Sequence, residues 1–215
     1  MGARTQVPRL GVLWCPHWPV VVAGAAAGEP VAVVHANRVV AHSRAAGAEG
    51  ITVGQRRREA QASCPAVRIE QHDPARDARM FEQVVRAIGV QVPRLEVTEP
   101  GMLTFVARGP ARYFGGEVAM AEMLARTAAE SLNEPAGAID PLAAVGSLGI
   151  GVADGRFAAV VAARPQARHG LEVVAVPGGD DQVVVVLRTG GGAHPAGGQI
   201  QFGRLAMDEG DVVLG

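Results

Sequence analysis

Three consecutive arginines, Arg56–Arg58, carry side chains suited to binding phosphate. A guanidinium contacts a phosphate group through paired hydrogen bonds, so this run predicts a contact with nucleic acid. The alternative is a solvated helix face on which the arginines pair with Glu59. Because the formal net charge of the whole chain is −1, a nucleic-acid partner would depend on a local basic patch of this kind.

Two further arginines, Arg156 and Arg164, lie at the ends of a predicted helix and could also meet phosphate, although a structural role is the favoured interpretation. The 20 basic residues of the chain are arginines, and alanine, glycine and valine are abundant. This bias is typical of a GC-rich genome and does not by itself indicate a function.

The thiols and imidazoles of the chain could in principle bind a metal ion. Cys15, His17 and Cys64 have no spacing typical of a zinc site, and two cysteines form no disulfide framework. We therefore interpret both cysteines as buried or half-buried thiols. His17, His42 and His72 show no partner pattern and are predicted to be surface or hairpin residues. No phosphate-binding glycine loop is evident either, since the glycine run at 190–192 lacks the lysine of a P-loop.

Local sequence patterns predict the elements that must position these residues. The helix after Asp73-Pro74 is the clearest, because Asp73 is a suitable N-cap and apolar residues recur at helical spacing up to Ile88. The hairpin around Pro100-Gly101 is equally clear. Strands are predicted at 10–14, 30–34, 39–42, 67–70, 95–98, 102–106, 145–152, 171–176 and 183–187, helices at 20–27, 55–64, 74–88, 117–132 and 155–163, and loops at 45–54 and 108–116.

This order of elements predicts an α+β fold of the ferredoxin-like kind, an antiparallel sheet with helices on one face. The chain has 215 residues, of which 48% are hydrophobic, enough for one large domain or two small ones. No signal peptide and no apolar stretch of about 20 residues is found, so a cytoplasmic protein without a membrane partner is expected.

Four stretches, taken in order, resemble one known family, the Y-family translesion DNA polymerases, and most closely their catalytically inactive ImuB group. They are Gly11–Pro19 followed by Pro30–Val34, Ala41–Ala60, Gly109–Gly116 and Gly149–Ala159. The resemblance covers roughly residues 9–177. It implies a palm domain over 9–36 and 69–177 with a small fingers insertion over 37–68, and leaves residues 178–215 as an unassigned glycine-rich tail.

The same resemblance shows what the site lacks. Active members hold two Mg²⁺ ions with carboxylates, first in an Asp-x-Asp pattern on the opening strand and again at a later hairpin. Here the matching positions hold Trp14 and Pro16, and then Pro100 and Gly101, with Glu99 adjacent. We therefore predict no nucleotidyl transfer and no bound cofactor or metal.

The positions that would hold the nucleotide triphosphate match Arg44 and Gly47, so Arg44 is the remnant of that pocket. The DNA-binding candidates are Arg56, Arg57, Arg58 and Arg156.

The resemblance implies an adaptor in DNA repair and damage-induced mutagenesis, as part of the SOS response and translesion synthesis. Its implied partners are damaged or primer–template DNA, the sliding clamp, a RecA-like accessory protein and an error-prone C-family polymerase. The family's thumb and little finger have no counterpart here, and residues 199–202 only faintly resemble a clamp-binding peptide. Two alternatives stand: an active polymerase fragment, which would need Mg²⁺, and a decayed binding module without a role on DNA.

Overall fold

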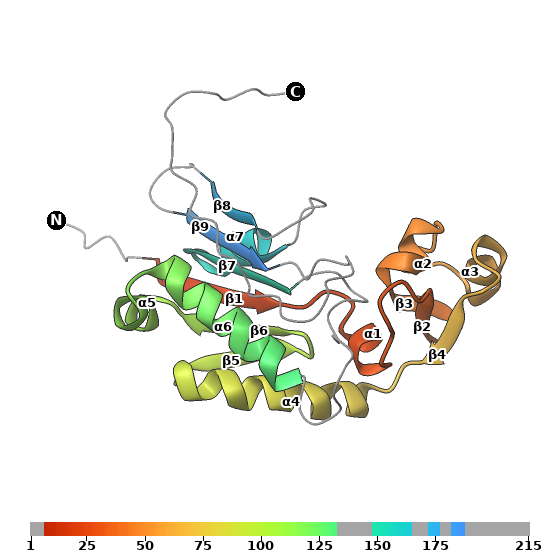
Figure 1. The fold of residues 1–215 in the computed structure, drawn as a ribbon, viewed down its shortest axis with the longest axis horizontal. Helices are drawn as coiled ribbons and strands as arrows, with labels where there is room; N and C mark the ends of the chain where they lie inside the picture. The colour runs from red at the N-terminus through yellow and green to blue at the C-terminus, as the bar shows by residue number, and fades with distance from the viewer. Residues whose placement is uncertain (1–6, 133–147, 165–171, 177–181, 188–215) are drawn as a thin grey trace, which may run out of the picture.

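The computed structural model describes residues 7–132, 148–164, 172–176 and 182–187. Within them, six strands form one sheet in the order β5-β6-β1-β7-β9-β8, and three form another in the order β3-β2-β4. Figure 1 shows that the two sheets belong to two lobes that lie side by side. We call the part built on the six-stranded sheet the large lobe and the part built on the three-stranded sheet the small lobe.

The sheet of the large lobe is antiparallel throughout. Its strands are β1 (Arg9–Trp14), β5 (Leu95–Glu99), β6 (Met102–Val106), β7 (Leu148–Asp154), β8 (Glu172–Val176) and β9 (Gln182–Leu187). β1 lies in the middle and pairs with both β6 and β7. The predicted antiparallel fold class and the β5–β6 hairpin are confirmed. β9 falls in the segment that the sequence left unassigned, yet it pairs with β7 and β8.

Two long helices, α4 (Pro74–Gln91) and α6 (Glu117–Leu132), cover one face of this sheet. α4 begins where the sequence predicted, because the Asp73 carboxylate accepts hydrogen bonds from the backbone N–H groups of Ala75 and Arg76, both at 3.0 Å. The apolar stripe of α4 faces the main hydrophobic core, where Phe81 and Ile88 are buried. The helix extends three residues beyond the predicted end.

The helix predicted at 155–163 is confirmed as α7 (Arg156–Ala163), but it lies on the opposite face of the sheet, so the helices are not confined to one face as predicted. It packs closely because β7 carries glycines beneath it. A Cβ atom at Gly149 would lie 2.0 Å from the Ala163 carbonyl oxygen, and one at Gly151 would lie 2.3 Å from the Ala163 nitrogen. No larger residue fits at these two positions, so the glycines determine where α7 lies.

The loop predicted at 108–116 is wrong, because residues 108–114 form a helix, α5 (Arg108–Phe114). Gly109 and Pro110 disfavour the interior of a helix, but both lie in the first turn. A proline is tolerated there, since its missing N–H would have no partner inside the helix. Ala111 is buried, and its backbone N–H donates to the Ala107 carbonyl at 2.8 Å.

The small lobe consists of β2 (Val31–His35), β3 (Arg38–His42), α2 (Arg44–Ala48), α3 (Arg57–Ser63) and β4 (Arg68–Gln71). β2 pairs antiparallel with β3, as predicted, and parallel with β4. A separate hydrophobic cluster lies inside it, made of Ala32, Val34, Val39, Ala46, Ile51, Ala60, Cys64 and Val67. The predicted domain boundaries at 36/37 and 68/69 stay a prediction; β2 lies before the first and β4 spans the second.

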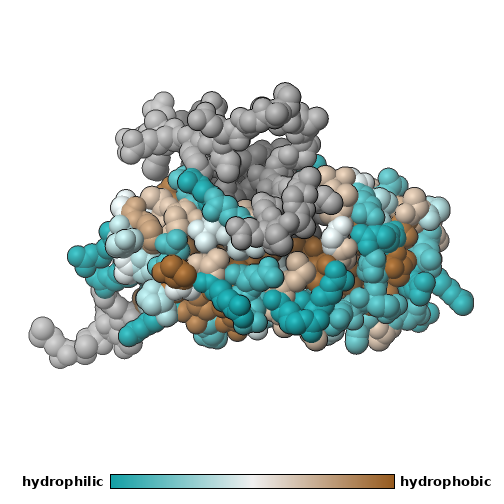
Figure 2. Space-filling model, turned by 60° about the horizontal axis from the view of Figure 1, so that its bottom comes forward, coloured by the Kyte–Doolittle hydropathy of each residue, from teal (hydrophilic) through white to brown (hydrophobic). Residues whose placement is uncertain are grey.

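The short helix α1 (Trp18–Val22) follows β1 and leads from the large lobe towards the small one. It starts earlier and ends earlier than predicted. In Figure 2, hydrophilic residues cover most of the described surface of the face shown, and hydrophobic residues form separate small areas. Within the described ranges, no helix is long and apolar enough to cross a membrane.

Candidate functional site at the junction of the two lobes

The four positions predicted from the resemblance to match the family's metal ligands meet at one corner of the large lobe. Trp14, the last residue of β1, pairs with Met102 of β6 and with Gly149 of β7. The backbone N–H of Cys15 then donates to the Gly101 carbonyl at 2.7 Å, which brings the end of β1 against the β5–β6 turn. Gly101 is required here, because its φ is 94° and a Cβ atom would lie 2.7 Å from the Trp18 Cβ.

A pocket of about 310 Å³ opens between this corner and the small lobe. Its walls come from the end of β1, α1, β3, the start of α4 and the β5–β6 turn. The lining residues are Trp14, Cys15, His17, Trp18, Pro19, Val40, Ala41, His72, Pro74, Asp77, Glu99 and Pro100. No arginine lines it among the described residues.

Two acids line the pocket, and they differ in environment. Asp77 is buried on α4, and its Oδ2 lies 2.9 Å from His72 Nε2. Burial raises the pKa of Asp77, and the contact with His72 opposes that rise. Glu99 is exposed at the end of β5. Neither acid occupies one of the positions that match the family's metal ligands.

The residues at this corner do not fit a pair of Mg²⁺ ions, which the fold family implies. Trp14, Pro16, Pro100 and Gly101 carry no side-chain oxygen, and Mg²⁺ prefers carboxylate and water oxygens in octahedral geometry. In the described part of the chain, no group of three histidine, cysteine or acidic residues is placed to hold a metal ion. No step through a metal ion can therefore be built from these four positions.

The cysteines are buried, as predicted. Burial raises the pKa of the Cys15 thiol to about 12, so the thiol stays protonated at neutral pH and is a poor nucleophile. Trp18 is also buried, and its indole N–H donates to the Asp77 carbonyl at 3.0 Å. Trp18 belongs to the main hydrophobic core.

The histidines were predicted to be surface or hairpin residues. This is confirmed for His42, which ends β3 of the β2–β3 hairpin, whereas His17 and His72 are half-buried and have hydrogen-bond partners. His17 precedes α1 with φ 55°, and its Nδ1 accepts a hydrogen bond from the His42 backbone N–H at 3.3 Å. The two rings lie 4.4 Å apart. Burial and the nearby His42 lower the pKa of His17 to about 4, so its ring is neutral at pH 7. These partners lie far apart in sequence, and no local spacing could have revealed them.

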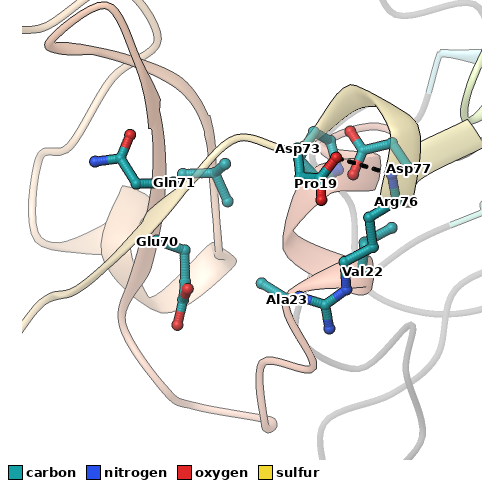
Figure 3. Close-up of a pocket in the computed structure, with 9 residues that line it drawn as sticks. Pro19, Val22, Ala23, Glu70, Gln71, Asp73, Arg76 and Asp77 are labelled. Atoms are coloured by element: carbon teal, nitrogen blue, oxygen red, sulfur yellow. Dashed lines mark hydrogen bonds between the residues drawn. The ribbon is translucent and has the colours of Figure 1, made fainter.

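The small crevice on the same junction is shown in Figure 3. Glu70 and Gln71 of β4 lie on one side, and Asp73, Arg76 and Asp77 at the start of α4 lie on the other. Its volume of about 20 Å³ leaves room for little more than one water molecule. The crevice is therefore part of the lobe junction and not a substrate site.

Arg56, Arg57 and Arg58 lie at the start of α3, in the outer part of the small lobe (Figure 1). All three are exposed, and no ion pair within the described residues involves them. The predicted pairing with Glu59 takes another form. The Glu59 carboxylate accepts a hydrogen bond from the Arg56 backbone N–H at 2.9 Å and so caps the helix.

Arg44 is exposed at the first position of α2. Gly47, the other position matched to the triphosphate grip, serves packing instead. A Cβ atom at Gly47 would lie 2.9 Å from Cε1 of His42, so the absence of a side chain makes room for that ring.

Arg156 and Arg164 lie at opposite ends of α7, and the structure places them differently. The guanidinium of Arg156 pairs with the Glu96 carboxylate at 2.5 Å. Arg156 closely follows Asp154, and Asp154 pairs with Arg9 of β1. Arg9 and Trp14 are at opposite ends of β1. Arg164 instead lies over the Trp14 ring, 5.9 Å from its centre. Arg164 therefore lies at the corner that contains Trp14, whereas Arg156 does not lie with the arginines of α3.

Comparison with known proteins gives a consistent result. The model of the impB/mucB/samB family matches residues 19–138. Among solved structures, the chain is similar to DinB from Sulfolobus solfataricus, with 14% identity and a TM-score of 0.58, and to the insertion ternary complex of Dbh DNA polymerase, with 14% identity and a TM-score of 0.56. Each alignment covers 73% of this chain and 46% of the other. No curated protein matches the chain.

Proposed function

The chain belongs to the impB/mucB/samB family and contains a Y-family polymerase-like domain, and we propose that it is a non-catalytic member acting as a DNA-binding adaptor in DNA repair and damage-induced mutagenesis. One observation carries the proposal. The corner where β1 meets the β5–β6 turn holds Trp14, Pro16, Pro100 and Gly101 in place of carboxylates. Because phosphoryl transfer by polymerases depends on metal-bound carboxylates, this corner supports no nucleotidyl transfer.

The acids that remain near the corner do not replace the missing ligands. Asp77 contacts His72, and its burial favours the protonated form. Glu99 is one exposed carboxylate, whereas a two-metal site needs several that converge. Glu99 is nevertheless the feature that favours the alternative of an active fragment, and primer extension with Mg²⁺ tests it.

The contact with DNA is proposed for Arg56, Arg57 and Arg58. Three adjacent exposed guanidiniums without ion-pair partners in the described residues can release counterions from a phosphate backbone. Arg44 lies exposed on the neighbouring α2 of the same lobe. Arg156 contributes less in this proposal, because Glu96 already neutralises it.

The finer parts of the proposal come from the resemblance to the ImuB group. They are a role in the SOS response and translesion synthesis in the cytoplasm, with the sliding clamp, a RecA-like accessory protein and an error-prone C-family polymerase as partners. Residues 199–202, the faint clamp-binding pattern, lie outside the described residues. The chain aligns with less than half the length of the solved polymerases.

The test is fluorescence anisotropy of a labelled primer–template duplex at two salt concentrations. We expect salt-sensitive binding that weakens about ten-fold or more in an Arg56/Arg57/Arg58→Ala variant, because each lost phosphate contact lowers affinity and the salt slope. The matched control is Arg86→Ala, which removes an exposed arginine already paired with Glu82 and should leave affinity unchanged. Absence of binding at low salt would refute the DNA role, and primer extension dependent on Glu99 would refute the non-catalytic one.

A further inference from the structure

The end of the large lobe away from the pocket carries an exposed aromatic side chain that the proposed function does not use. Tyr113 on α5 is 83% exposed. Its ring lies edge-on to Phe114 at 4.8 Å, and Phe114 packs against the main core. Tyr113 is thus supported by a fixed neighbour while most of its surface faces solvent. An exposed aromatic ring held in this way is a stacking platform rather than a packing residue.

The same helix presents unneutralised positive charge. Arg108 and Arg112 are one turn apart on α5, and both are exposed. None of the ion pairs found in the described ranges involves them. The acid nearest to α5 in sequence, Glu117, accepts two hydrogen bonds of 2.8 Å from Arg9 and is already neutralised. The outer face of α5 therefore attracts anions.

The turn of α5 before Tyr113 has an open surface at Gly109. Gly109 lies four residues before Tyr113, so the two positions are adjacent on one face of the helix. A Cβ atom added at Gly109 would have no heavy atom within 4 Å, apart from its own helix neighbours. Side chains on a helix lean towards its N-terminus, so Tyr113 is directed towards the turn that holds Gly109, where no side chain occupies the surface.

We propose that α5 is a second nucleic-acid contact, which stacks a base of single-stranded DNA on Tyr113 and holds the flanking phosphates with Arg108 and Arg112. Single-strand binding surfaces combine aromatic platforms with basic side chains in this way. An acidic protein segment would satisfy the two arginines but has no use for an exposed ring beside open space. Figure 1 shows α5 and α3 at opposite ends of the molecule, so this contact is separate from the one proposed for Arg56–Arg58.

Its test uses the full chain and a labelled oligothymidine in an anisotropy titration at low salt. Gly109→Glu should weaken binding ten-fold or more, because it fills the stacking space and neutralises the arginines. Gly109→Ala is the matched control and should bind within two-fold of wild type, since a methyl group meets nothing there. Tyr113→Ala should lose about 5- to 100-fold in affinity, and Tyr113→Phe should keep it, because stacking needs the ring and not the hydroxyl.

Three outcomes would overturn the proposal. The first is a Gly109→Glu variant that binds oligothymidine as tightly as wild type, and the second is a Gly109→Ala variant that loses as much affinity as Gly109→Glu. The third is a Tyr113→Ala variant with unchanged affinity, together with displacement of the DNA by an oligoglutamate peptide. The last result would assign the surface to an acidic protein instead. Circular dichroism of each variant separates lost folding from lost contact. The proposal is independent of the fingers, because the Arg56/Arg57/Arg58→Ala variant should keep its binding to oligothymidine whether or not it loses the duplex.

Discussion

The large and small lobes are stabilised in different ways. The large lobe buries aromatic and long aliphatic side chains, including Trp18, Phe81 and Phe105, between its sheet and its helices. The buried cluster of the small lobe contains no aromatic side chain among its described members, and alanine and valine dominate it. Because apolar burial stabilises roughly in proportion to area, the small lobe gains less from its core.

Hydrogen bonds and ion pairs add to the stability that the small lobe gains from its core. Ser43 is fully buried, and its hydroxyl accepts from the Val31 N–H at 3.0 Å, donates to the Glu29 carbonyl at 2.7 Å and caps α2. Arg68 of β4 pairs with Glu29 at 2.7 Å and with Glu70. Because the small lobe has the smaller apolar core, we expect it to depend more on these hydrogen bonds and to open locally before the large lobe does.

The largest expected loss of stability follows from a substitution in the core of the large lobe. Phe81→Ala should lower the free energy of unfolding by about 3–5 kcal/mol, because it empties a site that is 2% exposed and removes the ring contact with Trp18 at 5.1 Å. Urea denaturation measures it. The same substitution at Phe157, which is 83% exposed, is the control and should cost less than about 0.5 kcal/mol. Similar losses at both positions would contradict the placement of the core.

An intermediate loss of stability is expected from a substitution in the small lobe. Ser43→Ala should cost about 2 kcal/mol, because it leaves the Val31 N–H and the Glu29 carbonyl without their buried partner. Native-state hydrogen exchange should show faster exchange in β2 and β3 and unchanged exchange in β1. Ser63→Ala, at an exposed position on α3, is the matched control. Equal acceleration in both lobes would show that they unfold as one unit and would break the comparison.

The smallest expected loss of stability comes from the junction of the two lobes and depends on pH. The pKa of His17 is near 4 in the folded protein and near its ordinary 6.5 in the unfolded chain. The unfolded chain therefore binds a proton first as pH falls, and stability present above pH 6.5 is lost between pH 6.5 and 4. The loss should be about 1–2 kcal/mol, less than the full shift implies, because the ring is partly exposed.

His17→Asn isolates this contribution. Asparagine tolerates the left-handed backbone at this position, and its carbonyl oxygen can replace Nδ1 as the acceptor from the His42 N–H. Urea denaturation of both proteins between pH 7 and pH 4 should show a smaller decline in the variant. Parallel declines would mean that His17 is not held neutral by the junction.

Much of the fold followed from local pattern. The Asp73 cap and the apolar spacing of α4 depend only on neighbouring residues, as does the hairpin at Pro100-Gly101, and both were predicted closely. α5 was missed because Gly109 and Pro110 are helix breakers in isolation and become acceptable only in a first turn. At its start, the backbone N–H of Ala107 donates to the carbonyl of Arg9, which lies 98 residues earlier in the sequence. Local spacing could not have revealed this hydrogen bond.

The amino-acid sequence by itself determined that Trp14, Pro16, Pro100 and Gly101 carry no side-chain oxygen, because residue identity is independent of how the chain folds. Only the tertiary structure decided that His17 meets His42, that His72 meets Asp77 beside the pocket, and that Arg164 rather than Arg156 lies over Trp14. Such contacts join different elements, and their geometry depends on strand order and helix packing rather than on the spacing of residues along the chain.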